Sequence, residues 1–184
     1  LPPAAAALDV AELEKLCAQH RLKIAAFGTG GGWVRHQLHL VHPEAEHRRQ
    51  ARDFIAGIVD AGARLGVPAI IGSMQGRWSG TVTREQALAW LAEALDELAP
   101  RAAAHGVPLF FEVLNRYETN LLNRVADALD FLKTVRAPNV RLLCDLYHMN
   151  IEEADLPAAL RLAGARLGHV HFADSNRRAI GFGH

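Results

Sequence analysis

Three residues able to bind a metal or move a proton stand where short apolar runs of the sequence end. Glu112, Asp145 and His171 each follow a stretch with the length and apolar character of a buried strand. Adjacent parallel strands lie about 4.8 Å apart, so side chains at neighbouring strand ends can share a cation. We therefore expect Glu112, Asp145 and His171 to point into one shared site.

The donor set of this expected site indicates its chemistry. Two carboxylates and an imidazole suit Mn²⁺ first, with Mg²⁺, Co²⁺ or Zn²⁺ as alternatives. Such a metal could polarise a substrate carbonyl, which makes the proton on the neighbouring carbon acidic. Glu112 is then the candidate general base, and a metal-stabilised enediolate is the expected intermediate. Glu118, His148 and Arg177 follow these strands on loops, where they could hold the hydroxyl groups of a sugar or keto-acid substrate.

The elements that must position these residues alternate strictly between helix and strand, with no hairpin signal between them. Apolar strands between amphipathic helices predict a parallel sheet covered on its outer side. The predicted helices span residues 4–20, 43–65, 83–105, 120–135 and 156–163, and the predicted strands span 22–27, 69–71, 107–113, 140–144 and 169–172.

Two architectures fit this alternation, an open doubly wound sheet and a (β/α)8 TIM barrel. The open sheet binds nucleotides at a glycine-rich turn that leads directly into a helix. Gly28-Thr29-Gly30 begins such a pattern, but Trp33 stands where the third glycine belongs, and the stretch from Trp33 to His42 is predicted to be a polar loop. A barrel places catalytic groups at the carboxyl ends of several strands, which favours the barrel. A whole barrel takes roughly 250 residues and eight strands, so we expect residues 1–184 to form one incomplete barrel domain that lacks the first strands and the last strand.

Composition excludes several classes of protein. The 184 residues carry 20 basic and 20 acidic side chains, which leaves no electrostatic footprint for nucleic acid or for a membrane surface. No apolar run approaches the roughly 20 residues that span a bilayer. Cys17 and Cys144 do not resemble a disulfide framework, which favours the reducing cytoplasm. We expect a cytoplasmic protein that binds a small molecule, with a homo-oligomer as an open alternative to a monomer.

Three motifs carry a resemblance to a known family. The stretches Phe111–Glu118, Asp145–Glu153 and His169-Val170-His171, the last followed by Asp174–Arg178, resemble the sugar isomerase/epimerase branch of the xylose isomerase-like TIM barrels. The ketose 3-epimerases are the most similar group, with hydroxypyruvate isomerases as relatives.

This resemblance assigns roles to the six residues. It implies that Glu112, Asp145 and His171 bind a divalent metal, with Glu112 also the catalytic acid/base, and that Glu118, His148 and Arg177 contact the sugar. The family has a fourth ligand and second base, a glutamate on its last strand, that this sequence does not include. A molecule without that glutamate would show weak turnover.

Two other functions stay open beside the sugar isomerase. One is a zinc phosphodiesterase of the apurinic endonuclease type on the same barrel, which the neutral charge disfavours. The other is a non-catalytic sugar-binding barrel. A metal site made of His36, His39 and His42 is disfavoured, because a loop at that spacing is more often solvated or forms a lid. Trp33 and Trp78 could either wall the substrate pocket or pack in the core.

Overall fold

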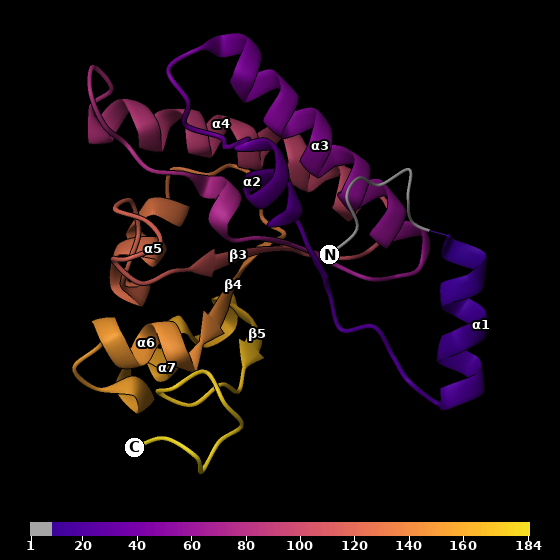
Figure 1. The fold of residues 1–184 in the computed structure, drawn as a ribbon. Coiled ribbons are helices and arrows are strands. Elements are labelled where there is room, and N and C mark those ends of the chain that lie inside the picture. The colour runs from indigo at the N-terminus through magenta and orange to yellow at the C-terminus, as the bar shows by residue number, and fades with distance from the viewer. Residues whose placement is uncertain (1–8) are drawn as a thin grey trace.

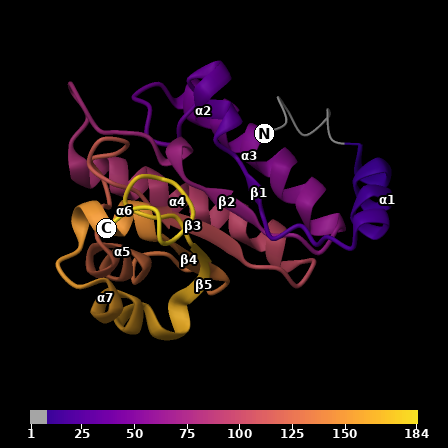
Figure 2. The same ribbon diagram turned by 60° about the horizontal axis from the view of Figure 1, so that its bottom comes forward.

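A single parallel sheet organises the chain. The computed structural model describes residues 9–184, and in them five strands lie in the order β1-β2-β3-β4-β5, so each strand pairs with the next one in the sequence (Figures 1 and 2). This sequential strand order is typical of a barrel wall. In a doubly wound sheet the strand order reverses near the centre of the sheet. The strands are β1 (Phe27–Gly28), β2 (Ala69–Ile71), β3 (Leu109–Val113), β4 (Val140–Asp145) and β5 (Leu167–His171).

Helices connect successive strands, and α3, α4 and α5 pack against β2, β3 and β4 respectively. Figures 1 and 2 show α3 and α4 side by side along one face of the sheet, while α1 stands apart from it. Thr83 caps the start of the helix predicted at 83–105, since its side chain accepts the Gln86 N–H. The helices are α1 (Val10–His20), α2 (Gly31–His36), α3 (Ala45–Arg64), α4 (Arg84–Ala103), α5 (Val125–Leu132), α6 (Leu146–Glu152) and α7 (Leu156–Ala163), with 3₁₀ turns η2 (Ser73–Gln75) and η3 (Gly164–Arg166).

Two predictions about local structure are wrong, and one helix was not predicted. Of the strand predicted at 22–27, only Phe27 lies in a strand, β1. Phe27 pairs with Ala69, the first residue of β2, so residues 22–26 have no partner on β2. The loop predicted from Trp33 to His42 begins inside α2, which packs so closely that a Cβ on Gly32 would lie 2.5 Å from Met74 Sδ. Helix α6 was not predicted at all. The predicted helix at 4–20 is confirmed from Val10, and its first residues lie outside the described part.

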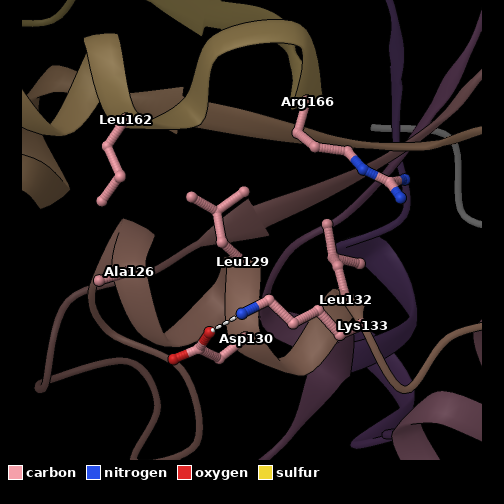
Figure 3. A pocket seen from close by; sticks show the side chains of 7 residues that line it. All are labelled: Ala126, Leu129, Asp130, Leu132, Lys133, Leu162 and Arg166. Atoms are coloured by element: carbon pink, nitrogen blue, oxygen red, sulfur yellow. Dashed lines mark hydrogen bonds and ion pairs between the residues drawn. The ribbon is translucent and has the colours of Figure 1, made fainter.

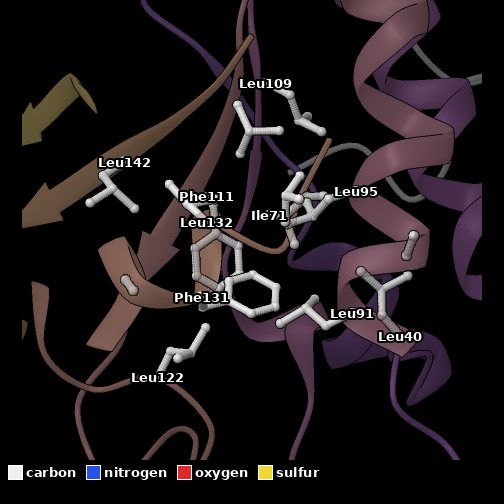
Figure 4. Packing of buried hydrophobic residues seen from close by; sticks show 14 of the residues in the cluster. Leu40, Ile71, Leu91, Leu95, Leu109, Phe111, Leu122, Phe131, Leu132 and Leu142 are labelled. Atoms are coloured by element: carbon white, nitrogen blue, oxygen red, sulfur yellow. The ribbon is translucent and has the colours of Figure 1, made fainter. Parts of the chain in front are cut away.

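The main core fills the space between the sheet and the outer helices. Phe111 and Leu142 point outward from β3 and β4 and meet Phe131 of α5 and Leu91 of α4 in one continuous cluster (Figure 4). The opposite face of the sheet carries a smaller cluster of Ile70, Phe110 and Leu143. Because side chains alternate along a strand, Glu112 and Asp145 share this second, inner face with Phe110 and Leu143.

The pairing of β4 with β5 contains one irregularity. Leu142 pairs with Leu167, but Leu143 pairs with His169, so Gly168 is an extra residue on β5. A Cβ on Gly168 would lie 2.6 Å from both Arg141 Cβ and Phe110 Cε1. Only glycine therefore fits this bulge without displacement of its neighbours.

Cys17 and Cys144 are both free, as expected, and burial raises the pKa of the Cys144 thiol to about 11. Among the helices of residues 9–184, none combines the length and the apolar character that crossing a membrane requires.

Asp96 of α4 fastens the connection between α5 and β4. Its carboxylate accepts the backbone N–H groups of Arg136 and Ala137 at 2.8 and 2.9 Å. We expect Asp96→Ala to lower the free energy of unfolding by about 2 kcal/mol, because the buried N–H of Ala137 loses its partner. Urea unfolding at pH 7 measures this loss.

Asp130→Ala is the control, since Asp130 makes only an exposed ion pair with Lys133 and its removal should change stability little. Equal effects of the two substitutions would contradict the assignment.

The contribution of Asp96 should depend on pH in a defined direction. Burial pushes the pKa of Asp96 upward, but the hydrogen bonds from the Arg136 guanidinium and the two backbone N–H groups outweigh it and hold the pKa below its usual 3.8. A carboxyl group whose pKa is lower in the folded state stabilises the fold above its unfolded-state pKa and loses that effect as the pH falls through the folded-state value. The stability difference between wild type and Asp96→Ala should be equal at pH 7 and pH 5 and shrink below about pH 3.8.

Candidate active site

One cavity at the carboxyl ends of the strands collects the six residues predicted to bind metal or substrate. It has a volume of about 290 Å³, and β1, β2, β3, β4, β5 and the loops after them form its wall. Pockets for drug-sized ligands begin at about 300 Å³, so this cavity suits a smaller molecule. Its lining includes Glu112, Glu118, Asp145, His148, His171 and Arg177.

The centre of the cavity is a histidine held between two carboxylates. His171 Nδ1 lies 3.2 Å from Asp145 Oδ2 and 3.6 Å from Glu112 Oε1. The hydrogen bond to Asp145, and then the nearby Glu112 carboxylate, raise the pKa of His171 to about 9 against the opposing effect of burial. Burial would raise the pKa of Asp145, but the hydrogen bonds from His171 and from the Tyr147 N–H outweigh it, so this pKa is lowered. The two carboxylates thus concentrate negative charge that a cation can neutralise.

The two oxygens of Asp145 have different partners. Asp145 is the N-cap of α6, and its Oδ1 accepts the backbone N–H of Tyr147 at 2.8 Å. The other oxygen, Oδ2, faces His171. The cap explains why α6 starts immediately after β4, and the helix in turn places His148 in the cavity.

His148 is oriented by Asn115, a buried residue that the sequence analysis did not single out. The backbone N–H of Asn115 donates to His148 Nδ1 at 3.3 Å, and the Asn115 amide nitrogen lies 2.8 Å from the same atom. Because Nδ1 accepts, the neutral ring carries its proton on Nε2, which lies 3.9 Å from Glu112 Oε1. His148 therefore presents an N–H donor to the cavity.

The donor chemistry fits a hard divalent cation. Glu112, Asp145 and His148 each have a ligand atom within 4.8 Å of the other two, while His171 contacts both carboxylates from the side of β5. Two carboxylates with imidazole suit Mn²⁺ or Mg²⁺. His148 thus has a ring nitrogen within reach of both carboxylates, while the predicted ligand His171 must first lose the proton that the two carboxylates stabilise.

Glu118 and Arg177 form the outer rim of the cavity. Arg177 donates to Glu118 Oε1 at 3.0 Å, and its guanidinium lies 4.4 Å from the centre of the Tyr147 ring. The neighbouring Arg116 pairs with Glu152 and leaves Glu118 to Arg177. The ion pair is partly exposed, so both groups can exchange partners with a ligand's hydroxyl groups at little cost.

Two tryptophans considered in the sequence and one further groove lie outside this cavity. Trp33 and Trp78 pack against the main core and do not line it. A larger groove of about 410 Å³ runs between α5 and the segment from α7 to η3 (Figure 3). Leu129, Leu132 and Leu162 form its apolar wall, together with Ala126. Of its three charged side chains, Asp130 and Lys133 pair with each other in an exposed ion pair, and Arg166 is the third. No histidine or second carboxylate lines this groove, so it does not repeat the donor set of the cavity.

The fold and this cavity can be compared with known proteins. Residues 2–184 match the family model described as "Xylose isomerase-like TIM barrel". The chain belongs to the xylose isomerase-like TIM barrel family. The predicted family and the predicted incomplete barrel are thereby confirmed.

Similar members of the xylose isomerase-like family are epimerases. The chain is 33% identical over 173 residues to the D-psicose 3-epimerase of Ruminiclostridium cellulolyticum, which covers 89% of this chain and 59% of that protein. It is 43% identical over 108 residues to the L-ribulose 3-epimerase of a Methylomonas species, over 59% of this chain and 37% of that protein. A crystal structure of a D-psicose 3-epimerase in the presence of D-fructose superposes with a TM-score of 0.80 at 31% identity, over 96% of this chain and 62% of that one. The chain thus spans less than two thirds of each relative.

Gly72, at the end of β2, leaves the space that the Glu112 carboxylate fills. A Cβ at Gly72 would lie 2.5 Å from Glu112 Oε2. We expect Gly72→Ala to weaken Mn²⁺ binding by at least about tenfold, because the flexible carboxylate must turn away from the cation position. Calorimetric titration with Mn²⁺ measures the change.

Gly66→Ala provides the opposite control. Gly66 has φ +67° and open space around its Cβ position, so alanine there strains the backbone without touching the cavity. Gly66→Ala should lower stability and leave Mn²⁺ affinity unchanged. Unchanged affinity in Gly72→Ala would show that Glu112 is not a ligand in this position.

Proposed function

We propose that this chain forms the metal-binding half of a divalent-metal-dependent ketose epimerase or isomerase. The observation that carries the proposal is the cavity in which Glu112, Asp145 and His171 meet the sugar-binding candidates Glu118, His148 and Arg177. The similarity to D-psicose and L-ribulose 3-epimerases supports a ketose as the substrate class. Mn²⁺ is the proposed metal, because the set is rich in carboxylate oxygen.

Each residue then has a distinct task. Glu112, Asp145 and His171 would hold the metal, which supplies polarisation of the substrate carbonyl and so acidifies the adjacent C–H. Glu112 takes that proton as general base and leaves an enediolate. His148 donates its Nε2–H to a substrate oxygen, in the tautomer that Asn115 fixes. When substrate binds, the ion pair between Glu118 and Arg177 opens, and both side chains hydrogen-bond to substrate hydroxyl groups instead.

The test follows hydrogen exchange on one face of the substrate, since Glu112 can remove the proton, exchange it with solvent and return a deuteron to the same carbon without a second base. The protein is loaded with Mn²⁺ and incubated with D-psicose or L-ribulose in D₂O, and deuterium at the carbon next to the carbonyl is followed by NMR. Incorporation above that with Mn²⁺ alone supports the proposal. Sugar binding without incorporation favours the non-catalytic sugar-binding barrel. Nicking of abasic DNA without incorporation favours the phosphodiesterase.

A further inference from the structure

A second group of possible metal ligands lies outside the cavity, in the connection between α2 and α3. His39 and His42 belong to this connection, and His47 lies in the first turn of α3. One ring nitrogen of each histidine lies within 4.8 Å of those of the other two. None of the three lines the cavity that holds Glu112. The proposed function therefore gives these histidines no task.

The backbone and the surrounding side chains hold this group in place. The Leu40 N–H donates to Met74 O at 2.9 Å, which fastens the connection to η2. The His39 ring meets Trp33 edge to face at 5.7 Å, and its Nδ1 presses against Gly76, where a Cβ would overlap it. The rings of His42 and His47 stack at 3.8 Å. Backbone hydrogen bonds and ring packing thus hold the three imidazoles close together.

Lone pairs are available in this group. His47 Nε2 lies 3.1 Å from Gln37 O, and since a carbonyl can only accept, Nε2 carries the proton and Nδ1 is free to bind a metal. His39 Nδ1 lies against Gly76 with no hydrogen-bond partner among the described residues, so the tautomer with its proton on Nδ1 leaves the Nε2 lone pair for an ion. Burial, followed by the neighbouring His42 and His47, lowers the pKa of His39 to about 4, so this ring is neutral at pH 7.

Two features oppose a cation and limit its affinity. His42 Nδ1 accepts the Glu44 N–H at 3.1 Å. A metal at Nδ1 displaces this hydrogen bond, and a metal at Nε2 moves the ring proton to Nδ1, which can then no longer accept it. The Arg48 guanidinium lies nearby, although it is engaged by His42 O and Pro43 O and lies 3.8 Å from the centre of the Trp90 ring. Ligand nitrogens of a tetrahedral zinc ion lie roughly 3.4 Å apart, so the rings must also rotate inward.

We propose that His39, His42 and His47 form a second metal site, selective for Zn²⁺ over Mn²⁺, that fastens the α2–α3 connection to α3. Three imidazoles with no carboxylate suit Zn²⁺, whereas Mn²⁺ prefers oxygen ligands. A fourth position stays open to water, as in other three-histidine zinc sites. The loop interpretation of the sequence named His36 together with His39 and His42, but the third member of the group is His47, which α3 brings back to the other two.

The test separates this site from the carboxylate site by removing the latter. In an Asp145→Asn/His171→Ala background, competition of the protein with a chromophoric chelator for Zn²⁺ should show one ion bound per chain. Adding His47→Ala should weaken binding at least about 100-fold, since even loss of a residue that only supports a ligand costs 10- to 100-fold. His42→Ala is a second variant with the same expectation, and both histidines are partly exposed, so neither change removes core packing. His36→Ala is the matched control from α2 and should change Zn²⁺ affinity less than about twofold.

Thermal unfolding gives a readout independent of stoichiometry. Zn²⁺ should raise the Tm of the background protein, because a ligand bound only by the folded state stabilises it, and His47→Ala should remove that rise. Mn²⁺ at the same concentration should leave the Tm unchanged. No bound Zn²⁺ in the background protein, or equal Zn²⁺ binding with and without His47→Ala, would overturn the proposal.

Discussion

Glu112→Gln should abolish deuterium incorporation next to the carbonyl of a ketose, with a rate loss of about 10³-fold or more. The substitution keeps the shape of the side chain but removes the group that accepts the proton, and a positioned base contributes 10²- to 10⁴-fold. Loss of a carboxylate ligand should weaken Mn²⁺ binding as well. Exchange is therefore measured at Mn²⁺ concentrations that saturate the variant.

The control for this experiment is Glu97→Gln. Glu97 lies on α4, is largely exposed and pairs with Arg52, far from the cavity lining. The same chemical change there should alter neither exchange nor Mn²⁺ affinity. Unchanged exchange in Glu112→Gln would rule out Glu112 as the base.

Two substitutions at Asp145 should distinguish its contribution to folding from its proposed contribution to metal binding. Asp145→Asn and Asp145→Ala should both weaken Mn²⁺ binding at least about 100-fold, because both remove a charged ligand. Only alanine also removes the acceptor for the Tyr147 N–H. Asparagine caps helices about as well as aspartate, so Asp145→Ala should be about 1 kcal/mol less stable than Asp145→Asn.

Urea unfolding and Mn²⁺ calorimetry on the two variants check this prediction together. A further expected difference is in His148, which α6 positions and which the loss of the cap should loosen. Asp145→Asn binding Mn²⁺ like the wild type would remove Asp145 from the ligand set. Equal stabilities would mean that α6 does not depend on its cap.

The strand ends could be predicted from the sequence because apolar runs of the right length stop there at charged residues. Glu112 and Asp145 lie on the inner face with Phe110 and Leu143, as alternation along a strand requires. The segment 22–26 shows the limit of this reasoning. It is as apolar as a strand, but Leu22 is 65% exposed, because no neighbouring strand begins early enough to pair with it.

Helix α6 and Asn115 were missed for different reasons. The α6 segment contains Tyr147, His148 and Asn150, which are weak helix formers, and the one usable signal was Asp145 as an N-cap. Asn115 acts through a histidine that lies 33 positions later in the sequence, a contact that no local pattern encodes. The role of Gly72 could not be predicted either, because it lies in the missing side chain, which leaves room for the Glu112 carboxylate.

The bulge at Gly168 decides which chemistry β5 contributes. Continuous pairing from Leu142 and Leu167 would set Asp145 opposite Val170 and turn both histidines of β5 toward the helices. The inserted glycine reverses that parity, so His171 pairs with Asp145 and faces the cavity, while His169 lies deeper and stacks on Phe110. Insertion or deletion of this one glycine would thus bring the proposed ligand His171 into the cavity or remove it from there, with the histidine itself still present in the sequence.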